Sequence, residues 1–350
     1  MPQSLRARWI DLGDVAPRAL HAAYMGLAAS QAVDAPPLLL WGRSGPHLSL
    51  GASQEAALEL DPAACRTQDI PWIRRPLGGG TVLVDGRQYS FFFVLPRAFD
   101  ARRPPLQPQA LFDFLAPAIV GTYQALGLPA AAQGRHDFWV NGRKIAGTGS
   151  GLLGPCQVFA SSFMLDFDAA LFARLVAAPS AGFRAWLAEA LAESMTSWRA
   201  EGSVPAPTAL AAALRAQVER HLGWRLEESA PTPSEAAAMA AALDEVEADE
   251  WEAESSSSKR RVPYGIKVKA DTYLTERHWD GEWVRILTRA GRIARVAGAG
   301  PLMQAAITEA VLGCRPTAPE LEPRLRCLGP AAARHWAERI RQTAHVEENG

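Results

Sequence analysis

The chain has 350 residues, of which 48% are hydrophobic, and its formal net charge is −1. This length allows two domains with apolar cores, and the balanced charge gives no reason to expect a nucleic-acid partner. No apolar run approaches the length of a membrane span, and the first residues lack the apolar core of a signal peptide. The four cysteines show no C-x-x-C spacing. We therefore expect a cytoplasmic protein with reduced thiols and no membrane partner.

The first two thirds of the chain mix helical periodicity with short β-forming runs. His47 lies in one such run without a second metal-type residue nearby, so we expect a partly exposed strand residue rather than a ligand. The expected elements are helices over 17–33, 106–126, 168–178, 182–194 and 208–222, and strands over 38–41, 47–50 and 155–166.

Two β-hairpins are predicted between residues 81 and 146. Asp85-Gly86 and Asn141-Gly142 each separate two runs rich in β-formers, and both dipeptides are typical of type I′ turns. In the second hairpin, alternation places Asp137 and Lys144 on one face as diagonal neighbours, within reach of a long side chain. The expected cross-strand pairs are Val140–Arg143, Trp139–Lys144, Phe138–Ile145 and Asp137–Ala146. The side chains expected to face the core are those of Phe138, Val140 and Ile145.

Residues 74–81 (RRPLGGGT) could form an anion-binding loop. Three consecutive glycines let a backbone approach a ligand closely and turn its N–H groups toward an anion. Arg75 or Arg74 could add forked donors for phosphate or carboxylate. A Gly-Gly-Gly run by itself is more often a flexible turn, and no Gly-Lys-Ser/Thr follows to make a P-loop.

Lys144 is one of only four lysines among 36 basic residues. A chain so biased toward arginine is expected to keep lysine where a compact ammonium is needed. The alternative is a solvated lysine beside a turn. The neighbouring Gly-rich motif favours the interpretation that Lys144 is a functional residue.

Together these stretches resemble the signatures of the lipoate-protein ligase A family, in the biotin/lipoate protein ligase catalytic domain superfamily. Residues 74–85 (RRPLGGGTVLVD) are similar to the family's Arg-Arg-x-x-Gly-Gly-Gly-x-Val-x-His-Asp signature. Residues 134–148 are similar to its Gly-Arg-Asn-Asp…Lys-Lys/Val-x-Gly-Ser segment. Residues 41–54 resemble its substrate-pocket strands, ending in Gly-x-x-Gln, and residues 159–171 a later strand and helix start. The resemblance runs from residue 5 to about residue 225 and is weaker from 262 onward.

The resemblance implies a fold and a set of site residues. The implied fold is α+β, with a mixed, mostly antiparallel sheet and flanking helices as in class II synthetases and biotin ligases, plus a small α/β accessory domain. Lys144 would hold the α-phosphate and acyl carbonyl of an acyl-adenylate, and Asp137 the nucleotide end or its Mg²⁺. Arg75 would bind the phosphate or adenylate. Further implied contacts to acyl group or adenylate come from Gly78, Gly79, Gly80, Thr81, Gly147 and Thr148.

Three positions depart from the family pattern. Val84 stands where the family usually has His, His136 where it usually has Asn, and Ser161 near a position where His is common. These substitutions could retune the nucleotide pocket or the acyl specificity.

The last third reads as a connector followed by a small domain. The Ala-rich, acidic stretch that opens at Pro231-Thr232-Pro233 ends in the polar run 252–261, which is typical of a linker. The expected segments are a catalytic domain over 1–230, a helix and linker over 231–261, and an accessory domain over 262–350. Within that domain we expect strands over 264–274, 282–287 and 292–296 and helices over 301–312 and 331–343.

The implied activity is ATP- and Mg²⁺-dependent conversion of lipoate to lipoyl-AMP, followed by acyl transfer to a lysine of an acceptor lipoyl domain of the E2 or H-protein type. One alternative is an octanoyl- or lipoyl-transferase that needs no ATP and uses a Cys or Lys acting on an acyl-carrier thioester. Its nucleophile could be Cys156 only with a base and a thiolate-stabilising environment, and the sequence shows neither. Another alternative is a non-catalytic lipoate-binding protein. A biotin-protein ligase is not expected, because no Gly-Arg-Gly-Arg loop occurs.

Overall fold

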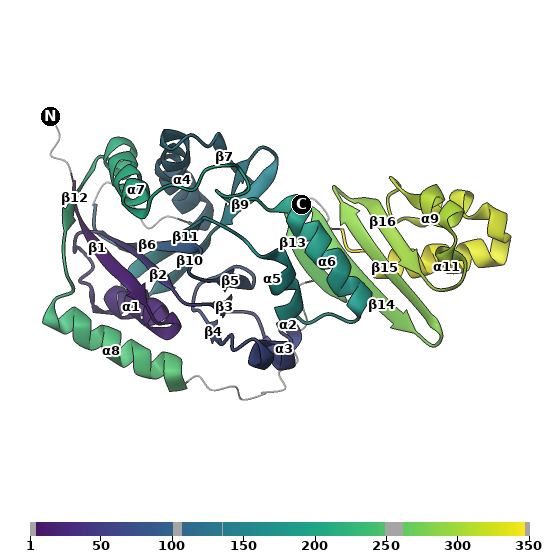
Figure 1. The fold of residues 1–350 in the computed structure, drawn as a ribbon, viewed down its shortest axis with the longest axis horizontal. Coiled ribbons are helices and arrows are strands. Elements are labelled where there is room, and N and C mark those ends of the chain that lie inside the picture. The colour runs from purple at the N-terminus through teal and green to yellow at the C-terminus, as the bar shows by residue number, and fades with distance from the viewer. Residues whose placement is uncertain (1–4, 101–106, 135, 249–261, 347–350) are drawn as a thin grey trace. The chain divides into compact units, whose positions relative to one another are not determined.

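The computed structural model describes residues 5–100, 107–134, 136–248 and 262–346. These residues form two compact units (Figure 1). Unit 1 contains the described residues of 5–57, 62–168 and 195–248, and unit 2 those of 58–61, 169–194 and 262–346. Within these ranges, no helix has both the length and the apolar character that crossing a membrane requires.

Unit 1 is built on a six-stranded sheet. Its strands are β1 (Leu5–Val15), β2 (Leu38–Ser44), β6 (Gln88–Pro96), β10 (Gly149–Leu153), β11 (Cys156–Met164) and β12 (Trp224–Glu228). Their order is β10-β11-β6-β2-β1-β12. Neighbours run antiparallel from β10 to β2, whereas β1 runs parallel to both β2 and β12. The sheet is thus mixed and mostly antiparallel, which confirms the expected α+β fold.

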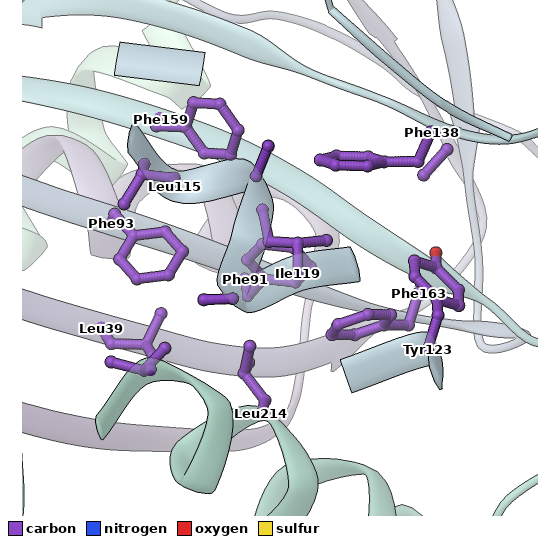
Figure 2. Packing of buried hydrophobic residues seen from close by; sticks show 14 of the residues in the cluster. Leu39, Phe91, Phe93, Leu115, Ile119, Tyr123, Phe138, Phe159, Phe163 and Leu214 are labelled. Carbon is purple, nitrogen blue, oxygen red and sulfur yellow. The ribbon is translucent and has the colours of Figure 1, made fainter. Parts of the chain in front are cut away.

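Helices cover both faces of this sheet. Every residue of β6 is buried, and alternation sends Phe91 and Phe93 to one face and Phe92 and Val94 to the other. The first face packs against α4 (Pro108–Ala125) and α7 (Pro207–Leu222), and the second against α1 (Pro17–Ser30) (Figure 1). Figure 2 shows the aromatic side chains of the first face interleaved with Leu115, Ile119 and Leu214. Two covered faces explain why β6 is a continuous apolar run.

Proline and glycine set the ends of these helices. Pro17, Pro108 and Pro207 each occupy a first helical position, where the missing N–H costs no hydrogen bond. Helix α7 ends at Gly223, whose φ of 69° is the left-handed conformation of a C-cap. The three helices therefore form close to the ranges predicted from the sequence.

The second predicted hairpin forms. Its strands are β8 (Asp137–Val140) and β9 (Arg143–Gly147), and β7 (Ala130–Gln133) completes a three-stranded sheet. Asn141 and Gly142 have φ values of 48° and 77°, as a type I′ turn requires. The three side chains predicted to face the core, Phe138, Val140 and Ile145, are buried in it.

The cross-strand register predicted for this hairpin is confirmed only next to the turn. Arg143 and Lys144 pair as predicted, but a β-bulge then places Ala146 opposite Phe138 and Gly147 opposite Asp137. The predicted pairs Phe138–Ile145 and Asp137–Ala146 are therefore wrong. The bulge adds one residue to β9, and it changes which residue lies beside Asp137.

The first predicted hairpin is wrong. Strand β5 (Val82–Val84) pairs with β3 (His47–Leu50), which also pairs with β4 (Trp72–Arg74), while β6 enters the large sheet. Neither Asp85 nor Gly86 has a positive φ. The Asp85 carboxylate instead accepts the backbone N–H of Arg87 at 2.8 Å and its guanidinium at 2.5 Å. This side-chain turn redirects the chain and replaces the type I′ turn.

Helix α8 (Pro233–Ala248) forms within the segment predicted as a helix and linker, and it packs in unit 1. Glu235 Oε2 accepts the N–H of Thr232 at 2.7 Å, and Thr232 Oγ1 accepts the N–H of Glu235 at 3.3 Å, which is a capping box. The helix lies so close to α1 that a Cβ on Gly26 would be 2.5 Å from the α8 backbone. The Ser-rich part of the expected linker, 249–261, lies outside the described residues.

Unit 2 combines a four-stranded antiparallel sheet with helices from separate parts of the chain. Its strands, in spatial order, are β13 (Gly265–Lys269), β14 (Thr272–Trp279), β15 (Glu282–Arg289) and β16 (Arg292–Gly298). Helices α5 (Ala169–Leu175) and α6 (Ala181–Ser194) belong to this unit, although they lie within the range expected for the catalytic domain. Helix α11 (Pro330–Thr343) has fourteen residues. The remaining helices described are short: α2 (Ala56–Glu59), α3 (Pro62–Thr67), η1 (Gly300–Met303), α9 (Ala305–Val311), α10 (Ala318–Leu321), η2 (Glu322–Arg324) and η3 (Arg326–Leu328).

Replacing Glu235 with Gln is expected to lower the free energy of unfolding by about 2 to 3 kcal/mol at neutral pH. Burial raises the pKa of Glu235, but hydrogen bonds from Arg8, the Thr232 N–H and Gln31 outweigh it and lower the pKa from 4.5 to about 2. The stabilisation is therefore complete above pH 4.5 and disappears as the pH falls through about 2.

Urea unfolding of the parent and Glu235→Gln between pH 7 and pH 2.5 would measure this difference. The difference in the free energy of unfolding between the two proteins should narrow below pH 4.5. Replacing the half-exposed Glu227 with Gln, as a control, should change the free energy of unfolding little at any pH. If the difference in the free energy of unfolding stays constant down to pH 2.5, hydrogen bonds to the ionised Glu235 carboxylate do not stabilise the protein.

Candidate functional site

The Gly-rich loop is held from inside the protein by Arg75. Arg75 Nη1 donates to the carbonyl of Ser49 at 2.6 Å and to its hydroxyl at 3.2 Å. Nη2 donates to the carbonyls of Gly78 at 3.1 Å and Gly80 at 2.7 Å. The guanidinium thus joins strand β3 to both ends of the three-glycine run, so the loop has a defined conformation.

These contacts also orient the loop's peptide groups. In a planar trans peptide the carbonyl of one residue and the N–H of the next point in opposite directions. Since the carbonyls of Gly78 and Gly80 point at Arg75, the N–H groups of Gly79 and Thr81 point away from it. The Gly79 N–H has no hydrogen-bond partner among the described residues. The loop therefore presents a donor of the kind that binds anions.

Arg75 is a buried cation without a buried anion. Its exposed fraction is 8%, and all its partners are neutral oxygens. Burial lowers the pKa of the guanidinium to about 10, which leaves it charged at neutral pH. No carboxylate in the described part of the chain pairs with it. An unpaired positive charge at this depth favours a negatively charged ligand nearby.

Three further glycines allow the loop to pack at backbone distance. A Cβ on Gly51, just after β3, would lie 2.0 Å from the Gly79 carbonyl oxygen. A Cβ on Gly149 would lie 2.9 Å from the Gly78 carbonyl oxygen, and one on Gly151 3.1 Å from that of Pro76. Sequence reasoning singled out none of these three positions for packing. The only available signal was the Gly-x-x-Gln pattern that Gly51 begins.

Lys144 and Asp137 form the second half of the site. Lys144 Nζ lies 2.8 Å from Asp137 Oδ1, and the two side chains are 21% and 17% exposed. The predicted contact between them is confirmed. Gly147, which the bulge places opposite Asp137, leaves the room that this pair occupies, because a Cβ there would lie 3.0 Å from Lys144 Nζ.

The segment from Gly147 to Ser150 brings the two halves together. Gly147 adjoins the Lys144 ammonium, and the carbonyl of Thr148 lies 3.7 Å from the Cβ position of Gly79. The N–H of Gly78 donates to the carbonyl of Ser150 at 3.0 Å. Two motifs that are about sixty residues apart in the sequence are therefore neighbours in space.

The remaining predicted site residues line the same region of unit 1. Thr81 Oγ1 donates at 3.2 Å to Gln54 Oε1, which also accepts the N–H of Gly51 at 2.9 Å. Thr148 Oγ1 donates to the carbonyl of His136 at 3.1 Å. These contacts tie the loop to β3 and the start of β8 to the segment after β9.

The departures from the family pattern have visible consequences. Ser161 Oγ donates to the Gly147 carbonyl at 2.8 Å and so fixes the segment beside Lys144. His136 is exposed and its ring lies 6.3 Å from that of Phe112. Val84 is 9% exposed, lies in the apolar cluster next to α1, and stands opposite His47 in the register of β3 and β5.

The expectation that His47 is partly exposed is wrong, because its exposed fraction is 0%. Strand β3 lies between β4 and β5, and all four of its residues are buried, so its faces as well as its edges are covered. Nothing local in the sequence distinguishes a covered four-residue strand from an edge strand.

Cys156 lacks the properties of a nucleophile. It is buried in the apolar cluster next to α1, and burial raises the pKa of its thiol to about 12. The reactive form of cysteine is the thiolate, which this environment disfavours.

The acidic groups of the site fit a magnesium ion only together with a ligand. No group of three or more metal-ligating side chains occurs in the part of the chain that the structure describes. Mg²⁺ is commonly held by one or two carboxylates plus substrate phosphates. Asp137 is the carboxylate in this site, and its Oδ1 also binds Lys144.

Comparison with solved structures shows a shared fold. A structure of a bi-partite lipoate protein ligase and its E2 lipoyl domain from Thermoplasma acidophilum aligns with a TM-score of 0.63 and 19% identity, over 69% of this chain and 92% of that one. Lipoate-protein ligase A bound with ATP aligns with a TM-score of 0.59 and 18% identity, over 68% and 94%. LipL1 of P. falciparum in complex with lipoate aligns at 0.54 and 9% identity, over 96% and 98%.

The family itself is shown by the sequence. No curated protein matches the chain. Residues 19–218, more than half of its length, match the family described as the lipoyl protein ligase A/B catalytic domain. That range includes the Gly-rich loop, Arg75, Asp137 and Lys144, and the chain therefore belongs to the family of the lipoyl protein ligase A/B catalytic domain.

Proposed function

We propose that this chain is a lipoate-protein ligase, which activates lipoate with ATP and transfers the lipoyl group to a lysine of an acceptor lipoyl domain. The observation that carries this proposal is the placement of the Lys144–Asp137 pair beside the Arg75-held glycine loop. Support comes from the family match and from two fold neighbours: a lipoate-protein ligase A bound with ATP, and LipL1 in complex with lipoate.

In the first step, a carboxylate oxygen of lipoate forms a bond to the α-phosphorus of ATP, and the bond to the pyrophosphate oxygen breaks. Negative charge on the α-phosphate increases during this step. The Lys144 ammonium would donate hydrogen bonds to those oxygens, and the Gly79 N–H would add a fixed dipole. Asp137 holds the ammonium in place through the 2.8 Å contact.

In the second step, the neutral amine of the acceptor lysine attacks the acyl carbonyl carbon, and the bond to AMP breaks. The attacking nitrogen loses a proton to solvent, and an amide and AMP form. Lys144 would now stabilise the carbonyl oxygen of the tetrahedral intermediate and the departing phosphate. No covalent acyl-enzyme is required.

Magnesium, when bound with ATP, would neutralise charge on the phosphates. Asp137 and phosphate oxygens would hold it. For Arg75 we propose a role different from direct phosphate binding. Four of its five N–H groups hold the loop and β3, so it contributes mainly loop geometry and long-range positive charge.

We further propose that unit 1 carries both chemical steps and that unit 2 is an accessory domain. All residues of the proposed site lie in unit 1. The alternative of a transferase with a cysteine nucleophile is not favoured, since the Cys156 thiol is buried and its pKa is raised to about 12.

Replacing Lys144 with Ala is expected to lower kcat for pyrophosphate release about 100- to 1000-fold, because it removes a preorganised donor to the charge that develops on the α-phosphate. Arg should not restore activity, since the space at Gly147 fits a compact ammonium. The measurements are pyrophosphate release and the intact mass of an apo lipoyl domain, with and without ATP.

The Lys267→Ala variant, which changes a lysine in unit 2, serves as control and should behave like the parent. Acyl transfer from an acyl-carrier thioester without ATP would instead establish the transferase. Lipoate binding with no pyrophosphate release would indicate a binding protein.

Replacing Gly147 with Ala is expected to lower kcat/KM about 10- to 100-fold while leaving the Tm nearly unchanged. The new Cβ would lie 3.0 Å from Lys144 Nζ and 3.6 Å from Asp137 Oδ1, so the ammonium must move while the backbone need not. Gly86→Ala is the matched control, because a Cβ there meets nothing within 4 Å. Equal activity of the two variants would show that the position of the ammonium does not matter.

A further inference from the structure

A chain of buried polar side chains runs from α1 to β3 inside the apolar cluster next to α1. Tyr24 Oη lies 3.1 Å from His21 Nδ1, and His21 Nε2 lies 3.1 Å from His47 Nε2. His47 Nδ1 lies 2.9 Å from the carbonyl oxygen of Gly45. The three side chains are at most 4% exposed. Buried polar groups in an apolar surrounding need full hydrogen bonding, so this chain constrains α1 and β3 relative to each other.

The contact with the Gly45 carbonyl, at one end of this row of polar side chains, decides which atoms donate and which accept. A carbonyl oxygen can only accept, so His47 Nδ1 must carry the proton that it donates to Gly45. Burial lowers the pKa of His47 to about 4. Burial, with smaller contributions from His47 and Arg75, also lowers the pKa of His21 well below its ordinary value. Both rings are therefore neutral, so His47 Nε2 accepts from His21 Nε2–H. His21 Nδ1 in turn accepts from the Tyr24 hydroxyl.

The polar chain ends close to Arg75. Ser49 lies two residues after His47 on β3, so their side chains share one face of that strand. Both the hydroxyl and the carbonyl of Ser49 accept hydrogen bonds from Arg75 Nη1. The position of His47 in β3 is thereby connected, through Ser49 and Arg75, to the carbonyls of Gly78 and Gly80.

The register of β3 and β5 shows which side chain of the neighbouring strand shares a face with His47. His47 stands directly opposite Val84. Side chains directly opposite each other in an antiparallel pair lie on the same face, about 4.5 to 5.5 Å apart at Cβ. The imidazole of His47 therefore lies on the same face of the strand pair as the side chain of Val84.

We propose that His47 is a positioning residue of the acyl-adenylate site, which fixes β3, and with it Ser49, Arg75 and the glycine loop, against α1. The effect on catalysis rests on the proposed ligase function, but the effect on the loop does not. Loop order and ligase activity are therefore measured separately.

The first test compares His47→Leu with His47→Gln. Leucine fills the space but cannot accept the proton of His21 Nε2, whereas the glutamine carbonyl oxygen can. In His47→Leu we expect the amides of residues 78–81 to exchange with deuterium about tenfold faster, and kcat/KM for pyrophosphate release to fall about 10- to 100-fold, mainly through KM. In His47→Gln we expect both quantities to stay within about threefold of the parent.

The second test moves the imidazole across the strand pair. His47→Val alone should behave like His47→Leu, and the double variant His47→Val, Val84→His should recover at least half of the loss, on a logarithmic scale, in both quantities. Leu214→Ala is the matched control, because it removes a buried side chain on the opposite face of the sheet. It should lower the Tm without changing exchange at residues 78–81 or KM.

The outcomes separate the two proposals. Parental loop exchange in His47→Leu, or a double variant no better than His47→Val, would overturn the role of His47. Faster loop exchange in a protein whose parent releases no pyrophosphate would support the positioning role and contradict the ligase function.

Discussion

The hydrogen bonds from the buried Arg75 guanidinium to the carbonyls of Gly78 and Gly80 hold the candidate site together. Carbonyls that point inward toward a cation leave the next N–H groups pointing outward, so one interaction both rigidifies the loop and orients its donors. The guanidinium is buried without a carboxylate among the described residues. Its charge therefore remains available to attract an anionic ligand, which a salt bridge would have cancelled.

The doubly covered sheet allows this arrangement. Strand β6 is buried on both faces, and the apolar cluster next to α1 extends from it to Leu77, beside the glycine loop, and to Val84. An apolar surrounding makes unpaired polar groups costly, so buried polar groups beside this cluster need hydrogen-bond partners. Tyr24, His21, His47, Ser49 and Arg75 are hydrogen-bonded to one another or to the backbone.

Backbone contacts set the distances between the two halves of the site. Glycines at 51, 149 and 151 let the loop lie against its neighbours without side chains between them. Gly147 leaves room for the Lys144 ammonium in the same way. The geometry of the site thus depends on glycines as much as on charged side chains, since a methyl group added at Gly147 would crowd the Lys144 ammonium.

The sequence by itself determined the features that depend on neighbouring residues. The helices over α1, α4 and α7, the type I′ turn at Asn141-Gly142 and the Lys144–Asp137 contact were all predictable, because periodicity and a two-residue loop act locally.

Only the tertiary structure decided the rest. The bulge in β9 and the pairing of β5 with β3 depend on partners elsewhere in the chain. So do the docking of α8 on α1 and the burial of His47. The contacts of the Arg75 guanidinium with Ser49 of β3 and with the loop carbonyls also became known only from the folded backbone.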